Sequence, residues 1–149
     1  MKKFLFFLLL FAMHTSAEVS SSLDTDVQRD FDRAKKLSVD GFEEKAKISW
    51  MDFLRRYPSH GLSDNAHFHL GEIYQRQELF EQAILEFRKV FSDKRSDMRP
   101  QAALEMGNCL KKMNNPREAK IQWAAIVRVY PKSSAAAQAK LRLLELEKE

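Results

Sequence analysis

Three stretches of this 149-residue chain align on one another, and this internal repeat constrains the fold more than any other feature. A small residue recurs at separations of 37 and 36 residues, as Ala34, Gly71 and Gly107. Twelve residues further on an alanine recurs, as Ala46, Ala83 and Ala119. Four residues later a large aromatic residue recurs, as Trp50, Phe87 and Trp123. Eight residues beyond these stand Pro58, Arg95 and Pro131. Four coincidences in one register indicate a true repeat.

The repeated positions have a common physical meaning. From Thr25 onward apolar residues are spaced by three and four, which is the helical period, and apart from Gly71 and Gly107 of the repeat, Gly and Pro stand near helix boundaries. A small residue in the first helix of each unit lets the second helix pack closely, and the aromatic residue fills the space between neighbouring pairs. Proline then ends the second helix because it cannot continue it. This describes the helix–turn–helix unit of about 34 residues that is called the tetratricopeptide (TPR) repeat.

The register predicts an all-α TPR superhelix of three helix–turn–helix repeats plus a C-terminal capping helix. The predicted helix pairs are 25–39 with 43–57, 64–77 with 80–92, and 98–113 with 116–130, and the capping helix is 134–148. The TPR domain spans 25–149, with repeats at 25–58, 63–95 and 98–131. Tight turns are predicted at Gly41, at Gln77–Glu78 and at Asn114–Asn115.

The first segment is predicted to direct secretion rather than to fold. Lys2 and Lys3 precede an apolar run over 4–13, and Thr15, Ser16 and Ala17 supply the small residues of a cleavage site. Ten helical residues span about 15 Å, roughly half of a bilayer's hydrocarbon core, so an uncleaved membrane anchor is the weaker alternative. We therefore expect a signal peptide over 1–17, cut after Ala17, a flexible Ser-rich leader over 18–24, and a periplasmic protein.

The repeats resemble those of a known family. The stretches ISWMDFLRRYPSHGLSDNAHFHLGEIYQRQELFEQAILEFRKVF and REAKIQWAAIVRVYPKSSAAAQAKLRLL are similar to the C-terminal TPR domain of the Tol-Pal-associated YbgF or cell division coordinator CpoB family. The slightly long period and the YP endings carry the resemblance over about residues 28–146. It implies a non-enzymatic periplasmic scaffold in Tol-Pal-linked envelope constriction and cell division.

The chain differs from this family, and also from a second protein with similar repeats, in ways that leave other roles open. The family carries an N-terminal coiled coil that drives oligomerisation, and here only the Ser-rich leader stands in that place, so trimerisation by that route is not expected. The outer-membrane assembly lipoprotein BamD also has long repeats, but the only cysteine is Cys109, so no lipid-anchoring site follows the apolar run. A BamD-like assembly accessory and a regulatory TPR subunit of an envelope enzyme remain as alternatives, and self-association is open.

The residues that bear chemistry are scattered. His67 and His69 stand two apart, so on a helix they point about 200° apart and cannot chelate one metal ion. Cys109 has no histidine in its repeat to activate it, and we expect it to be a small buried residue. Ser63 and Asp64 before an apolar-periodic segment are interpreted as a helix N-cap. We predict no catalytic residues, no metal and no cofactor.

The charge balance also argues against a nucleic-acid partner. The chain has 25 Lys and Arg against 21 Asp and Glu, and loss of residues 1–17 removes two lysines and leaves 23 minus 21, or +2. A small-molecule substrate is not expected either, because no glycine-rich phosphate loop is present. The predicted partner is a protein or peptide segment of the cell envelope.

In TPR superhelices the first helix of each pair lines the concave face, and this selects a candidate partner-binding groove. Its residues are Gln28, Phe31, Lys35, Asn65, Phe68, Glu72, Gln75, Arg76, Gln101, Leu104, Asn108, Lys111 and Lys112. Phe31, Phe68 and Leu104 share one repeat position and would form an apolar row along the groove, flanked by amides and mostly basic charges, for a peptide of some acidic character. The alternative is that these three residues pack between adjacent first helices.

The groove differs from that of chaperone-binding TPR domains, which clamp a C-terminal carboxylate. Lys35, Glu72 and Asn108 share one repeat position, and the Glu72 carboxylate would repel such a ligand.

Overall fold

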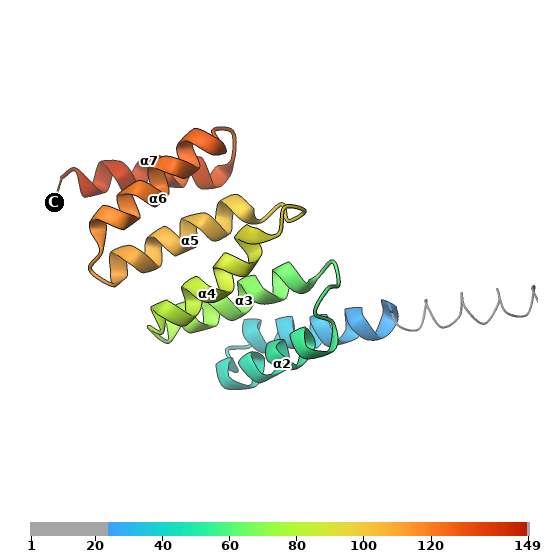
Figure 1. The fold of residues 1–149 in the computed structure, drawn as a ribbon. Coiled ribbons are helices and arrows are strands. Elements are labelled where there is room, and N and C mark those ends of the chain that lie inside the picture. The colour runs from blue at the N-terminus through green and yellow to red at the C-terminus, as the bar shows by residue number, and fades with distance from the viewer. Residues whose placement is uncertain (1–23, 149) are drawn as a thin grey trace, which may run out of the picture. The chain divides into compact units, whose positions relative to one another are not determined.

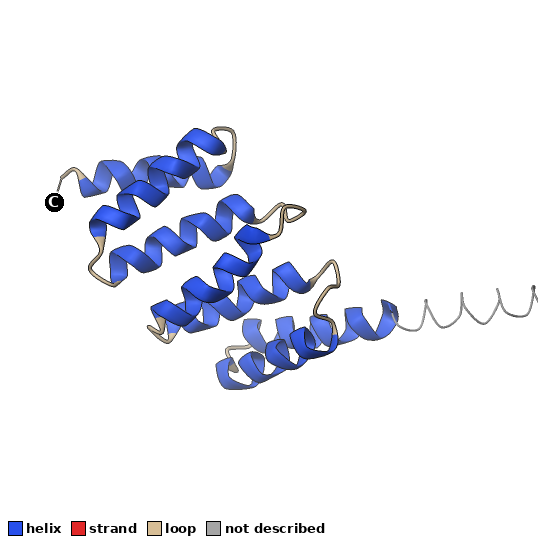
Figure 2. Cartoon of the chain, in the orientation of Figure 1, coloured by secondary structure: helices blue, strands red, loops and turns tan. Residues whose placement is uncertain are grey.

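The structure, a computed structural model, describes residues 24–148. These residues form seven helices joined by short turns and contain no strand (Figure 2). The predicted signal peptide over 1–17 and the first six residues of the predicted leader lie outside the described residues. The last leader residue, Asp24, already belongs to the first helix.

The observed helices begin within one residue and end within two residues of the predicted bounds. The first helix covers residues 24–39. It is followed by α2 (Glu43–Arg56), α3 (Ser63–Arg76), α4 (Phe80–Ser92), α5 (Arg99–Lys112), α6 (Pro116–Val129) and α7 (Ser134–Leu146). The 3.6-residue spacing of apolar side chains therefore predicted both the type and the extent of these elements.

The described residues divide into two compact units, 24–49 and 50–148, and the boundary lies within α2. The described part of the first unit holds the helix over 24–39, the turn at Gly41 and the beginning of α2. Its buried side chains are Val27, Phe31, Ala34 and Ala46. The repeat pattern predicted Ala34 and Ala46 as packing positions of the helix pair, whereas Phe31 was expected in the groove.

The second unit contains the rest of α2 and the helices α3 to α7. Each helix from α3 to α7 packs against the next, and α7 also packs against α5 (Figure 1). Ala135, Ala136 and Ala139 form the buried side of α7 and belong to one apolar cluster with Leu104 and Trp123. The alanine-rich start of α7 thus allows the last helix to approach the preceding pair closely, as the predicted capping helix requires.

Glycine and a large ring meet at two helix crossings of the second unit. A Cβ atom on Gly71 would lie 2.7 Å from a ring carbon of Phe87, and a Cβ atom on Gly107 would lie 2.4 Å from Nε1 of Trp123. Both rings are completely buried. These contacts give the physical reason why glycine and an aromatic residue recur sixteen positions apart.

The turns inside the helix pairs share one backbone feature. Gly41, Glu78 and Asn114 stand 37 and 36 residues apart, and their φ angles are +80°, +59° and +60°. A residue in the left-handed backbone conformation lets the chain reverse directly after a helix end, and glycine adopts this conformation without steric cost. All three predicted turns are confirmed. Within residues 24–148, none of the helices has both the length and the apolar character needed to cross a membrane.

Candidate protein-binding groove

The predicted groove residues fall in both units, so each unit is described separately. In the first unit, Gln28 and Lys35 are exposed, and the side chain of Gln28 donates a hydrogen bond to Asp32 at 3.0 Å. Phe31 is buried, with 7% of its surface exposed. The helix over 24–39 therefore presents polar side chains outward and keeps its aromatic residue inside.

The expected apolar row is not on the surface. Phe31 and Phe68 are each 7% exposed and Leu104 is 1% exposed. Phe68 packs on the ring of Phe87 at a centroid distance of 5.2 Å, and Leu104 belongs to the cluster around Trp123. The interpretation as an exposed row was wrong, and the alternative, core packing, describes these residues. A repeat position alone does not show whether a neighbouring helix covers a side chain.

A hollow in the second unit brings together five predicted groove residues. It has a volume of about 730 Å³ and lies along α3, α5 and α7. The five predicted residues in its lining are Gln75, Arg76, Asn108, Lys111 and Lys112. The other lining residues, which sequence reasoning missed, are Glu78, Phe80, Trp123, Arg142 and Glu145. Extending the register by 36 residues makes Arg142 equivalent to Met106, which is not a predicted groove position, so the repeat contained no signal for Arg142.

The charges around this hollow are mixed, with a basic excess. Arg76, Lys111, Lys112 and Arg142 contribute four basic groups against Glu78 and Glu145. Arg142 is already paired with Glu145 at 3.0 Å. Lys112 is exposed and lies at the C-terminal end of α5, where the helix dipole favours a positive charge.

The most connected residue near the hollow was absent from the predicted set. The Glu105 carboxylate, which is half-buried on α5, accepts hydrogen bonds from three amide side chains. Its Oε2 accepts from Gln75 at 3.2 Å and from Asn108 at 3.1 Å, and its Oε1 accepts from Gln101 at 3.0 Å. Three predicted groove residues therefore converge on one carboxylate, which ties α3 to α5.

The remaining predicted residues lie elsewhere on α3. Asn65 donates its side-chain amide to Asp64 at 3.0 Å. Glu72 contacts Nδ1 of His69 at 2.9 Å, and the His69 ring stacks on Trp50 at a centroid distance of 5.1 Å. Neither Asn65 nor Glu72 lines the hollow.

Trp123 contributes a polar group without a partner. The indole Nε1 is buried and has no hydrogen-bond acceptor. A buried unpaired donor costs roughly 1–3 kcal/mol relative to a satisfied one. Trp123 belongs to the lining of the hollow, but its ring is completely buried.

The thiol of Cys109 is held in its neutral form. Burial raises the pKa of this thiol to about 12, the Glu105 carboxylate adds to the rise, and a hydrogen bond with Gln75 opposes it. Because the thiolate is the nucleophile, such a cysteine is unreactive near neutral pH. The prediction that Cys109 is a small buried residue is confirmed.

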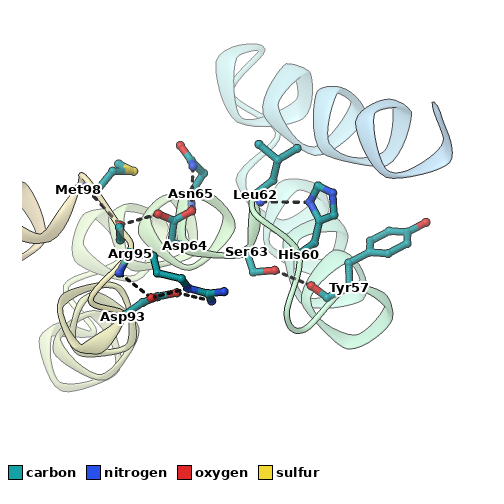
Figure 3. A network of polar contacts seen from close by, with 10 residues as sticks. Tyr57, His60, Leu62, Ser63, Asp64, Asn65, Asp93, Arg95 and Met98 are labelled. Atoms are coloured by element: carbon teal, nitrogen blue, oxygen red, sulfur yellow. Dashed lines mark hydrogen bonds and ion pairs between the residues drawn. The ribbon is translucent and has the colours of Figure 1, made fainter. Parts of the chain in front are cut away.

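A second polar network joins the turn before α3 to the turn before α5 (Figure 3). The hydroxyl of Ser63 donates to the carbonyl oxygen of Tyr57, and the buried hydroxyl of Ser96 donates to the carboxylate of Asp64. The N-cap position of α3 is Leu62, without a side-chain cap bond. The interpretation of Ser63 as the N-cap was therefore wrong, because its hydroxyl is used to hold the turn.

The histidines serve as local contacts. His67 is half-buried and its Nδ1 lies 2.7 Å from Oε2 of Glu86, which joins α3 to α4. His60 accepts a hydrogen bond from the backbone N–H of Leu62 at 3.1 Å. In the part of the chain that the structure describes, no three His, Cys, Asp or Glu side chains are placed to hold a metal ion.

Comparisons with known proteins support the fold. A family model described as tetratricopeptide repeat matches residues 101–133, which cover most of α5 and all of α6. The N-terminal domain of stress-induced protein-1 (STI-1) from C. elegans has a TM-score of 0.66 and 17% sequence identity, over 81% of this chain and 94% of that chain. Together with the helix pairs, these likenesses confirm the predicted all-α TPR fold.

A tetratricopeptide repeat protein from Parabacteroides merdae also matches, with a TM-score of 0.44 and 16% identity over 82% of this chain and 60% of that chain. No protein with a curated function matches the sequence.

Proposed function

We propose that this chain is a non-enzymatic protein-binding scaffold of the periplasm, which links an envelope protein segment to Tol-Pal-associated constriction during cell division. The observation that carries the binding role is the hollow of about 730 Å³ along α3, α5 and α7. TPR folds use such extended surfaces to bind proteins and peptides.

The lining of the hollow suits a peptide better than a small molecule. Small-molecule sites are mostly apolar with a few converging polar groups. Here amides and charges of both signs line the wall, and only the half-buried Phe80 adds exposed aromatic surface, since Trp123 is completely buried. Side chains of this kind form hydrogen bonds and ion pairs with a polypeptide, which offers both backbone and side-chain groups.

The envelope part of the proposal rests on the sequence. The positive start, the short apolar run and the small residues up to Ala17 support secretion, and the resemblance over residues 28–146 supports the link to the Tol-Pal system. With Cys109 as the only cysteine, the chain has no framework of structural disulfides, so its stability in an oxidising compartment rests on helix packing.

Site-specific photo-crosslinking in the native host tests the binding role. A photoreactive residue at Lys112, on the rim of the hollow, is compared with one at Lys132, an exposed lysine outside the hollow's lining. We expect Lys112, and not Lys132, to capture Tol, Pal or peptidoglycan-synthesis proteins. Capture of barrel-assembly components, or only of a second copy of this chain, would contradict the Tol-Pal role.

The N-terminus of the protein from the periplasmic fraction tests secretion separately. Mass spectrometry should find a chain that begins at Glu18, after loss of residues 1–17. A chain that stays in the cytoplasmic fraction would rule out the periplasmic assignment while leaving the binding role intact, and a membrane-bound chain that retains Lys2 and Lys3 would show an uncleaved anchor in place of a signal peptide.

A further inference from the structure

The Glu105 carboxylate has amide partners but no cationic one. It accepts from Gln75, Gln101 and Asn108, and none of the ion pairs among residues 24–148 includes it. A carboxylate can only accept, so each amide must turn its NH₂ group toward Glu105 and its carbonyl oxygen away. The surface around Glu105 is therefore rich in acceptors and carries one negative charge.

One acceptor position on Glu105 is left over. Each carboxylate oxygen offers about two acceptor positions. Oε2 is used twice, by Gln75 and Asn108, whereas Oε1 is used once, by Gln101. A half-buried carboxylate with a vacant acceptor position is a strong site for a lysine ammonium or an arginine guanidinium, because charge-assisted hydrogen bonds are about twice as strong as neutral ones.

The opposite sign of charge lies one to two helical turns further along α5. Glu105, Asn108 and Lys112 are spaced by three and four residues and therefore share one face of the helix. The separation of seven residues between Glu105 and Lys112 corresponds to about 10 Å along the helix axis. Glu105 does not itself line the hollow, but it is bonded to the lining residues Gln75 and Asn108, and Lys112 lines the hollow. A peptide in the extended polyproline II conformation covers about this distance in three residues and keeps side chains three positions apart on one side.

We propose that the hollow binds a peptide in the extended polyproline II conformation, which places a basic side chain against Glu105 beside the hollow and an acidic side chain, three residues away, against Lys112. This inference deepens the proposed function and rests on it. Charge complementarity at both ends would fix the direction and register of the peptide, since a reversed peptide would bring like charges together. A uniformly acidic peptide would meet the Glu105 carboxylate and be disfavoured.

Selection from a random linear nonapeptide display library tests the proposal with the full-length mature chain. The wild type should enrich peptides with Lys or Arg about three positions from Asp or Glu, in one order. The variant Glu105→Gln removes the negative charge but keeps a side chain of similar shape, and it should lose the basic preference and bind a wild-type-selected peptide about tenfold more weakly. Isothermal titration calorimetry with the selected peptide measures the affinity of both proteins.

A charge reversal on the other side supplies an independent test. Lys112→Glu changes an exposed side chain and should replace the enriched acidic residue by a basic one. Lys132→Glu, the same charge change outside the hollow's lining, should leave the selected peptides unchanged. Because Lys112 is exposed, this variant remains informative if Glu105→Gln melts below the assay temperature.

The outcomes separate the two proposals. Enrichment of purely acidic peptides, or an unchanged basic preference in a folded Glu105→Gln variant, would overturn the inference and leave peptide binding standing. Absence of any enrichment by the wild type over a non-binding control would overturn the inference together with the peptide-binding role of the hollow.

Discussion

At the crossing of α3 and α4 the ring of Phe87 lies against Gly71, and at the equivalent crossing of α5 and α6 the indole of Trp123 lies against Gly107. The two rings occupy the same register and are equally buried. The difference is chemical, because the indole brings a buried N–H without a partner whereas phenylalanine brings no polar atom. The repeat register therefore determines where a large ring must lie, but it does not determine whether that ring carries a polar group.

The same two helix pairs also differ in how their helices are tied. His67 and Glu86 join α3 to α4 with a contact of 2.7 Å. Thirty-six residues on, the equivalent positions are Ala103 and Gln122, and Gln122 donates to the backbone carbonyl of Ala103 at 3.5 Å. One pair is thus held partly by charge and the other by a weak amide contact, so we expect the pairs to respond differently to pH.

Removing the ring of Phe87 or Trp123 should produce the largest loss of stability. We expect Phe87→Ala and Trp123→Ala each to lower the free energy of unfolding by about 3–5 kcal/mol, because each leaves a large cavity in a close-packed core. Urea denaturation followed by circular dichroism measures both. Ile121→Ala, at a side chain that is 70% exposed, is the matched control and should change stability by less than about 0.5 kcal/mol. A near-zero cost for Trp123→Ala would show that the repeat register is wrong.

Adding a methyl group at either glycine should be the next largest effect. Gly71→Ala and Gly107→Ala should each lower stability by roughly 1–3 kcal/mol, because the new Cβ would meet a buried ring that has little room to move. The cost should be greater at Gly107, where the contact is 2.4 Å rather than 2.7 Å. Gly61→Ala is the control, since nothing lies within 4 Å of the position of its Cβ. Equal urea midpoints for all three variants would show that the rings of Phe87 and Trp123 do not lie this close to the two glycines.

The sequence predicted most of the architecture and only part of the groove. Helix positions and turns follow from spacing, which is local, so Gly41, Glu78 and Asn114 were placed correctly. The burial of Phe68 and Leu104 depends on how closely a neighbouring helix approaches, and no pattern within one repeat reports that distance. Glu105 was missed for a related reason, because its role arises from amides on two helices that meet only in three dimensions.

Acid should weaken the α3–α4 pair more than the α5–α6 pair. Burial raises the pKa of the Glu86 carboxyl, but hydrogen bonds from His67 and Lys89 and the charges of these residues outweigh it and hold the pKa below its ordinary value of 4.5. A lowered carboxyl pKa stabilises the folded state above the unfolded pKa, and this contribution is lost as the pH falls below about 4.5 through the folded pKa.

The variant Glu86→Gln tests this difference, because glutamine is the residue that stands at the equivalent position in α6. We expect it to lose about 1–2 kcal/mol at neutral pH and to show a shallower fall of the melting temperature below pH 4.5 than the wild type. Glu81→Gln, which changes an exposed carboxylate of the same helix, should keep the wild-type acid profile. If the melting temperatures of the wild type and Glu86→Gln depend identically on pH, the contact between His67 and Glu86 does not stabilise the α3–α4 pair through its charge.

The turns between the helices of each pair should give the smallest effect, and one of opposite sign. Glu78 and Asn114 adopt φ angles of +59° and +60° in equivalent turns, but a left-handed conformation costs an ordinary side chain about 1–2 kcal/mol and is easier for asparagine. Glu78→Gly should therefore raise the free energy of unfolding by about 0.5–1 kcal/mol, after the greater chain entropy of glycine in the unfolded state is subtracted. Asn114→Gly should raise the free energy of unfolding by a smaller amount. Thermal melts of the two variants measure the difference, and a larger gain at Asn114 would mean that the Glu78 side chain stabilises its turn by a contact that offsets the backbone strain.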